Sequence, residues 1–243
     1  MFDKTRIPIK LEKSPIKKAI IEMHYEGYYP EQALYGLLMD SFNLHQTPIS
    51  QLPLEVRTQD INLKYQVILE GLLKEIDESK YFFGIGNESI QFTVLDKYLS
   101  WNNWIPIVND AVEKLIDKKI IKKVNTITLQ YIDIFDTDIS KNINAQIYID
   151  NIPILMPPLS ISSTIMEKDV KIGINIGTPI NINGVLTEEK SLIDIKCSRD
   201  FISFEDFRNS YKDVLENEHA LNKRYFFGLL KQDLLESLGP KYE

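Results

Sequence analysis

Alternating apolar and polar residues predict a first strand over 18–26, which ends at Gly27. The same alternation predicts further strands over 60–71, 80–86, 88–97, 120–136, 144–150, 169–177 and 190–199. Helical spacing of apolar residues predicts helices over 30–43, 101–118, 204–217 and 219–238. In the first strand, one face carries Ile21, Met23 and Tyr25, and the other carries Glu22, His24 and Glu26.

A short pattern occurs twice, about a hundred residues apart. Residues 98–110 contain Tyr98-x-Ser100-Trp101-x-x-Trp104, and residues 201–213 contain Phe201-x-Ser203-Phe204-x-x-Phe207. Each copy follows a predicted strand, places a serine where a helix should begin, and adds two aromatic residues at helical spacing. The pattern predicts a strand-strand-helix unit that is used twice.

The order of these elements predicts the fold class. Strands follow one another in hairpins instead of alternating singly with helices, which is typical of an antiparallel sheet. We therefore expect an α+β fold, with a mostly antiparallel curved sheet and helices on one face. The expected organisation is a single globular domain over residues 1–243, with two related strand-strand-helix units in pseudo-repeat halves at 18–119 and 120–239.

The amino-acid composition limits the functions that the protein can have. The chain is 44% hydrophobic and 26% charged, as in ordinary globular proteins, and its net charge of −7 argues against a dedicated nucleic-acid surface. A lone cysteine, Cys197, allows no intrachain disulfide and fits a reducing compartment. No apolar run approaches the length of about 18 residues that a membrane-spanning helix needs. We expect a cytoplasmic protein, with Cys197 as a buried structural thiol.

The signatures of common enzymes and cofactor sites are missing. The sequence contains no GxxxxGK[ST], GxGxxG, HExxH, GxSxG or CxxC motif, so no cofactor or metal is predicted. Three weaker groups of residues remain as candidate binding positions. These are Glu22 with His24 on the first strand, Asp133 with Asp194 inside apolar strands, and the adjacent Tyr28 and Tyr29.

Each group has a physical reason to bind something. A carboxylate beside an imidazole orients it as a general base if the strand face lines a cleft, although a solvated strand surface explains the same pattern. A carboxylate in the centre of a strand either faces solvent or is paired, because burying it alone is costly. Exposed tyrosines are common at protein interfaces, although packing at the edge of the core also accounts for them.

Four segments of the chain form a recognisable set. They are the opening Pro15-Ile16-x-x-Ala19-Ile20-Ile21-Glu22, the central strand Leu129-Gln130-Tyr131-Ile132-Asp133-Ile134, the late strand from Leu192 to Ile195, and the closing His219-Ala220-x-x-x-x-x-Phe226. In these segments the chain resembles a sporadically distributed prokaryotic family of uncharacterised proteins of about 250 residues. The family pattern has an arginine where this chain has Gln130. The resemblance implies no established activity. A patchy distribution fits mobile or defence-linked genes, which is an analogy.

Three functions are compatible with these observations. The first is a non-enzymatic protein-binding or regulatory protein, in a defence or toxin-neutralising context, that acts through a protein partner or self-association. The second is a small-ligand or nucleotide-binding domain that uses a cleft where the two repeat units meet. The third is a metal-dependent hydrolase or nuclease that uses Glu22, Asp133 and Asp194.

Overall fold

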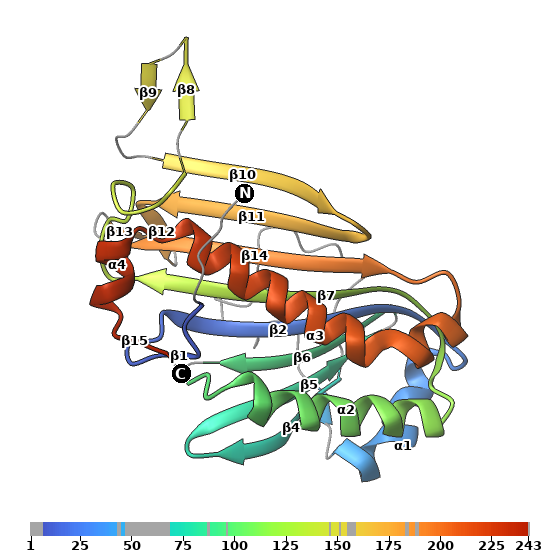
Figure 1. The fold of residues 1–243 in the computed structure, drawn as a ribbon. Coiled ribbons are helices and arrows are strands. Elements are labelled where there is room, and N and C mark those ends of the chain that lie inside the picture. The colour runs from blue at the N-terminus through green and yellow to red at the C-terminus, as the bar shows by residue number, and fades with distance from the viewer. Residues whose placement is uncertain are drawn as a thin grey trace. The chain divides into compact units, whose positions relative to one another are not determined.

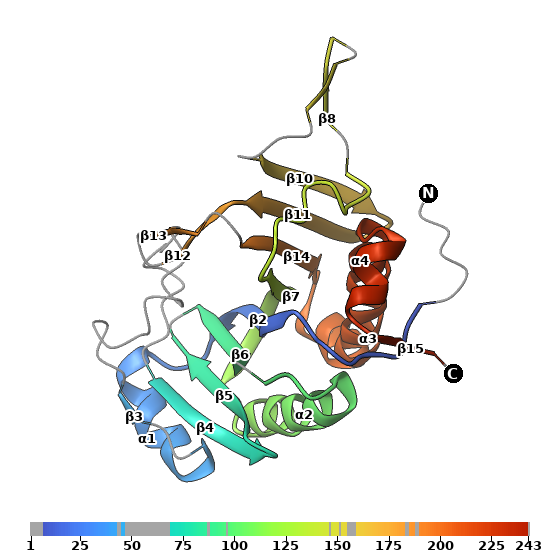
Figure 2. The same ribbon diagram turned by 90° about the vertical axis from the view of Figure 1, so that its left-hand side faces the viewer.

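A computed structural model describes residues 7–42, 45–46, 69–86, 88–95, 97–145, 147–150, 152–154, 159–182, 185–187 and 190–242. It is an α+β structure built on antiparallel strand pairs (Figures 1 and 2). Contacts divide the chain into two compact units: unit 1 comprises 1–17, 130–197 and 217–243, and unit 2 comprises 18–129 and 198–216. These units do not coincide with the sequence halves 18–119 and 120–239, and duplication of a strand-strand-helix unit stays a prediction.

Unit 2 contains six neighbouring strands in the order β7-β2-β6-β5-β4-β3. Helix α2 lies over β4–β6 (Figures 1 and 2), and the ring of Phe42 in α1 stacks on Phe83 in β5 with 4.5 Å between centroids. The elements are β2 (Ile16–Gly27), α1 (Glu31–Phe42), β3 (His45–Gln46), β4 (Leu69–Ile76), β5 (Ser79–Ile85), β6 (Ser89–Leu95), α2 (Trp101–Asp117) and the first part of β7 (Ile121–Phe135).

Unit 1 contains strands in the order β10-β11-β14-β7. Its core lies between the strands β7, β11 and β14 and the helices α3 and α4, and it includes Ile174, Ile195, Phe226 and Leu235. The elements are β10 (Leu159–Glu167), β11 (Val170–Thr178), β14 (Ser191–Asp200), α3 (Phe204–Leu229), α4 (Gln232–Ser237), and the short pairs β1 (Lys10–Leu11) with β15 (Pro240–Lys241), β8 (Ile147–Ile149) with β9 (Ile152–Ile154), and β12 (Ile180–Ile182) with β13 (Val185–Thr187).

The alternation predicted for the first strand is confirmed. Ile21, Met23 and Tyr25 are at most 2% exposed, whereas Glu22 and His24 are only partly buried. Cys197 is buried as predicted, and burial raises the pKa of its thiol to about 12. No helix in the described part of the chain is both long and apolar enough to cross a membrane.

The two serine-aromatic junctions share their local geometry. Ser100 Oγ accepts a hydrogen bond from Asn103 N at 3.2 Å, and Ser203 Oγ accepts one from Asp206 N at 3.1 Å. Each junction also has an edge-to-face ring pair, Tyr98 with Trp104 and Phe201 with Phe207, both at an interplanar angle of 89°. The serine caps and aromatic anchors of the pattern are therefore real, and both helix starts lie in unit 2.

Three predicted boundaries are wrong. The closing helices break after Leu229 and not near residue 218, because Leu230 forms a β-bridge with Ile143 and Lys231 N donates to Asn142 O. No strand is predicted between residues 150 and 169, but that segment contains β9 and β10. Strand 144–150 is the shorter β8, and residues 60–68 of the strand expected over 60–71 lie outside the described residues.

Candidate functional site

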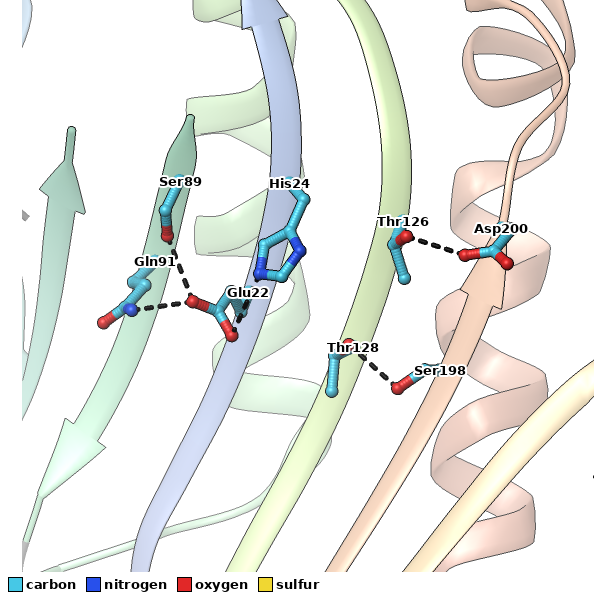
Figure 3. A network of polar contacts seen from close by, with 8 residues as sticks. All are labelled: Glu22, His24, Ser89, Gln91, Thr126, Thr128, Ser198 and Asp200. Atoms are coloured by element: carbon cyan, nitrogen blue, oxygen red, sulfur yellow. Dashed lines mark hydrogen bonds and ion pairs between the residues drawn. The ribbon is translucent and has the colours of Figure 1, made fainter. Parts of the chain in front are cut away.

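Strand β2 holds the Glu22 carboxylate between two neighbouring side chains of β6. Glu22 pairs with Gln91 in the strand register, and His24 pairs with Ser89. Glu22 Oε1 accepts hydrogen bonds from Gln91 Nε2 at 2.9 Å and from Ser89 Oγ at 3.1 Å, while its Oε2 lies 3.6 Å from His24 Nε2 (Figure 3). Register and side-chain bonding together fix this carboxylate in one orientation.

These contacts also set the charge of Glu22. Burial raises its pKa, but the hydrogen bonds from His24, Gln91 and Ser89 and the charge of His24 outweigh burial, so the pKa of Glu22 lies below its ordinary value. The side chain is still 27% exposed. Glu22 is thus an ionised, oriented acceptor that solvent or a partner can reach.

Glu22 and His24 do not form a catalytic triad with the neighbouring Ser89. Ser89 donates its hydroxyl to Glu22 and is fully buried, so it is not placed for attack by way of His24. The arrangement instead provides a fixed hydrogen-bond acceptor, the Glu22 carboxylate, next to the His24 imidazole, which is 30% exposed.

Two further polar pairs lie beside Glu22 on the same side of the strands (Figure 3). Thr126 Oγ1 donates to Asp200 Oδ1 at 2.7 Å, and the hydroxyls of Thr128 and Ser198 are 2.9 Å apart. Together with the Glu22 cluster they form the surface that we call the polar face of unit 2, made of Glu22, His24, Gln91, Thr126, Thr128, Ser198 and Asp200, with the buried Ser89 supporting Glu22.

Tyr28 and Tyr29 continue the chain directly from β2. Tyr28 N donates to Ile120 O at 3.2 Å, which anchors the backbone of this turn. The side chains of the two tyrosines are 61% and 40% exposed. They lie four and five residues beyond His24, and Glu26, near the end of β2, is exposed as well.

Asp194 takes part in a row of hydrogen bonds that crosses four strands of unit 1. Gln130 Nε2 donates to Asp194 Oδ1 at 2.7 Å, and Asn175 Nδ2 donates to Asp194 Oδ2 at 3.2 Å. Ser162 Oγ in turn donates to Asn175 Oδ1 at 2.7 Å. Asp194 is therefore paired, with Gln130 and Asn175 as its hydrogen-bond donors.

Asp133 does not fit the expectation of a solvent-facing or paired carboxylate. It is 2% exposed, and its Oδ1 has no hydrogen-bond partner among the described residues. Burial, reinforced by the charge of Asp194, raises the pKa of Asp133 well above its ordinary value. Burial therefore favours the neutral acid over the carboxylate at this position.

The three predicted carboxylates do not form one acidic patch within either unit. Asp133 shares the buried face of β7 with Tyr131 and Phe135, whereas Asp194 binds Gln130, whose position in the alternation of the strand is the opposite one. Glu22 belongs to unit 2, and the two aspartates belong to unit 1. Among the described residues, no three His, Cys, Asp or Glu side chains are grouped so that they could hold a metal ion.

A buried polar cluster in unit 1 was not anticipated from the sequence. His219 Nδ1 lies 3.1 Å from Tyr131 Oη, and Asn222 Nδ2 donates to Ile195 O at 2.9 Å. Glu218 is fully buried beside them on α3. Burial, with a smaller effect of Lys223, lowers the pKa of His219 to about 4. The signal was present, because Glu218 and Asn222 fall at the spacing of the buried stripe of the helix.

The polar partners of Glu22 were also missed. Ser89 and Gln91 alternate with Ile90 and Phe92 in a strand that the sequence did predict, so the sequence could have predicted that they share a face.

Comparison with known proteins adds no relative: no family model matches the chain, and no curated protein matches it. The resemblance to an uncharacterised family stays a prediction.

Proposed function

We propose that the chain is a non-enzymatic protein-binding protein whose recognition surface is the polar face of unit 2 with the adjoining Tyr28–Tyr29 turn. The observation that supports this most strongly is the Glu22 carboxylate, which is fixed by two donors and remains partly exposed. A preoriented anion needs no rearrangement to accept a charged donor, so it favours binding.

The chemistry of the surface indicates the kind of partner. Glu22, Glu26 and Asp200 bring negative charge to it, and the chain as a whole has a net charge of −7. Exposed tyrosines bury a large area at little cost in side-chain entropy and accept arginine stacking. We therefore infer that the partner presents an arginine or lysine to Glu22 and a flat or aliphatic surface to Tyr28 and Tyr29.

Site-specific photo-crosslinking tests this surface directly. A photoreactive phenylalanine analogue in place of Tyr29 should trap one protein species in the native host, whereas the same analogue in place of Asn102, exposed on α2, should not trap it. Equal trapping at both positions would count against the proposal. Identification of the trapped protein also tests the hypothesis of a defence or toxin-neutralising context.

The purified partner then allows a matched comparison of charges. Glu22→Gln keeps the side-chain shape but removes the charge, and we expect binding about tenfold weaker, as for a lost charge-assisted hydrogen bond. Asp213→Asn removes one charge from an exposed position of α3 and serves as the control. Titration calorimetry that gave the same affinity for both variants would refute the role of Glu22.

A further inference from the structure

Strand β10 forms the outer edge of the strand order in unit 1 (Figures 1 and 2). It pairs with β11 through nine consecutive residue pairs without a register shift. No other strand in the described part of the chain pairs with it, and Ser160 and residues 162–166 are all exposed. An edge of this kind presents a row of backbone donors and acceptors to any strand that approaches it.

The usual protections of an edge strand are absent from β10. Its sequence, Leu-Ser-Ile-Ser-Ser-Thr-Ile-Met-Glu, contains no proline, lysine or arginine, and its one charge is at the last residue, Glu167. Glu167 is occupied by α3, because it forms an ion pair with Arg224 and accepts a hydrogen bond from Tyr225 Oη at 3.0 Å. The strand is thus anchored at one end and neutral along the rest of its edge.

Side chains of β10 divide clearly between the two faces of the strands. Odd-numbered residues pair with buried residues of β11: Ile161 pairs with Ile176, Ser163 with Ile174, and Ile165 with Ile172. This face meets the helices, since those β11 residues belong to the core of unit 1. The even-numbered residues, Ser160, Ser162, Thr164 and Met166, lie on the opposite face.

We propose that β10 pairs antiparallel with β10 of a second copy of this chain, about a two-fold axis at Ser163. In this register Ile161 of each copy lies opposite Ile165 of the other on the helix-side face, and Ser162 lies opposite Thr164 on the other face. Ile165 is 37% exposed in one copy, so pairing would cover apolar surface. The contact closes on itself, as two-fold interfaces do.

Neighbouring registers are less complementary. A sheet that continues with its helix faces on one side requires residues of equal parity to lie opposite one another. Moving the axis to Thr164 would place Ile161 opposite Glu167, and moving it to Ser162 would place Ile161 opposite Ser163. The axis at Ser163 alone pairs both isoleucines with isoleucines and meets no charge within the central pairs. This inference is independent of the surface proposed for unit 2.

Cysteine cross-linking at the axis tests the register. Directly opposite residues in antiparallel strands have Cα atoms about 4.5–5.5 Å apart, within the range of a disulfide. Ser163→Cys should therefore form a disulfide-linked dimer under mild oxidation, and Lys171→Cys, exposed on β11, should not. The native Cys197 is buried and does not compete. Equal cross-linking of the two variants, or none with Ser163→Cys, would refute the register.

The mass of the untagged protein in solution tests the dimer itself. Sedimentation equilibrium should give a concentration-dependent monomer–dimer equilibrium for the native chain, shifted to monomer by at least tenfold in Ser163→Lys, where two ammonium groups would face each other. Asn102→Lys, exposed on α2, adds the same charge elsewhere and should leave the equilibrium unchanged. A monomer at all concentrations, an open series of larger species, or a dimer that tolerates Ser163→Lys would overturn the proposal.

Discussion

Replacing Asp133 by asparagine should change how the stability of the protein depends on pH. Asp133 is buried and its carboxyl is held neutral, with a pKa raised well above the ordinary value by burial and then by Asp194. Asparagine has nearly the same shape and no titratable proton, so the substitution removes the titration with little repacking. Both forms leave a polar group in the same buried place, and we expect similar stability near pH 4.

The magnitude follows from proton linkage. Above about pH 4 the unfolded chain has lost the Asp133 proton while the folded chain retains it, so the free energy of unfolding falls as pH rises. The slope for one proton is about 1.4 kcal/mol per pH unit, and it ends at the folded-state pKa. Asp133→Asn should therefore become more stable than the native protein by about 1.4 kcal/mol for each pH unit across that window.

Asp133→Asn has to be compared with the native protein because His219 changes the pH dependence of stability in the opposite direction. Its pKa falls from 6.5 to about 4 on folding, so the unfolded chain binds the extra proton and stability rises between these pH values. The two slopes offset one another in the native protein over this range. In Asp133→Asn the falling slope of Asp133 is removed, so the rise from His219, about 3 kcal/mol in total, should no longer be offset.

Urea unfolding at intervals from pH 4 to 9 measures these free energies. The quantity of interest is the difference between Asp133→Asn and the native protein, with Asp213→Asn as an exposed control that should give a flat difference. The pH at which the difference levels off gives the folded-state pKa of Asp133. A difference that does not change with pH would show that Asp133 is ionised in the folded protein, and the argument from burial would be wrong.

Other parts of the structure give independent predictions. Ser100→Ala and Ser203→Ala should each lower the free energy of unfolding by about 1 kcal/mol, since each removes an N-terminal cap; an unchanged denaturation midpoint would contradict this. Cys197 should resist a maleimide reagent in the folded protein and react only on unfolding, as mass spectrometry can show, because it is buried and its pKa is raised to about 12. Gly239→Ala should cost about 1 kcal/mol or more in thermal unfolding, because Gly239 has φ +64° and a Cβ there would lie 3.0 Å from the Cβ of Glu12.

The sequence predicted correctly those helices and strands that are determined by residues close together in the chain. The alternation in β2 gave the correct faces because its apolar and polar residues alternate without interruption. The start of α2 was found because Ser100 is an N-cap and its aromatic residues follow at helical spacing. The antiparallel character of the strands followed from their order along the chain.

Features set by distant residues could not be predicted in this way. Helix α3 ends where Asn144 Nδ2 donates to the carbonyls of Gly228 and Leu230, a partner some eighty residues away in the sequence. Strand β10 has no clear alternation, because as an edge strand it is exposed on both faces for most of its length. Asp133 was named correctly as unusual, but its burial depends on which face of β7 meets α3, and a single-residue change of register would reverse it.

The pairing of β1 with β15 has a mechanical consequence. Lys10 lies opposite Lys241 and Leu11 opposite Pro240, while Glu12 N and Lys13 N donate to the carbonyls of Gly239 and Leu238. Ile9 N donates to Lys241 O at 2.9 Å, so force applied between residues 9 and 241 would load this bond first and then the others one after another. Strands that are pulled apart from one end lose their hydrogen bonds one at a time, which needs little force. The β1–β15 pair should therefore separate before the core of unit 1 unfolds.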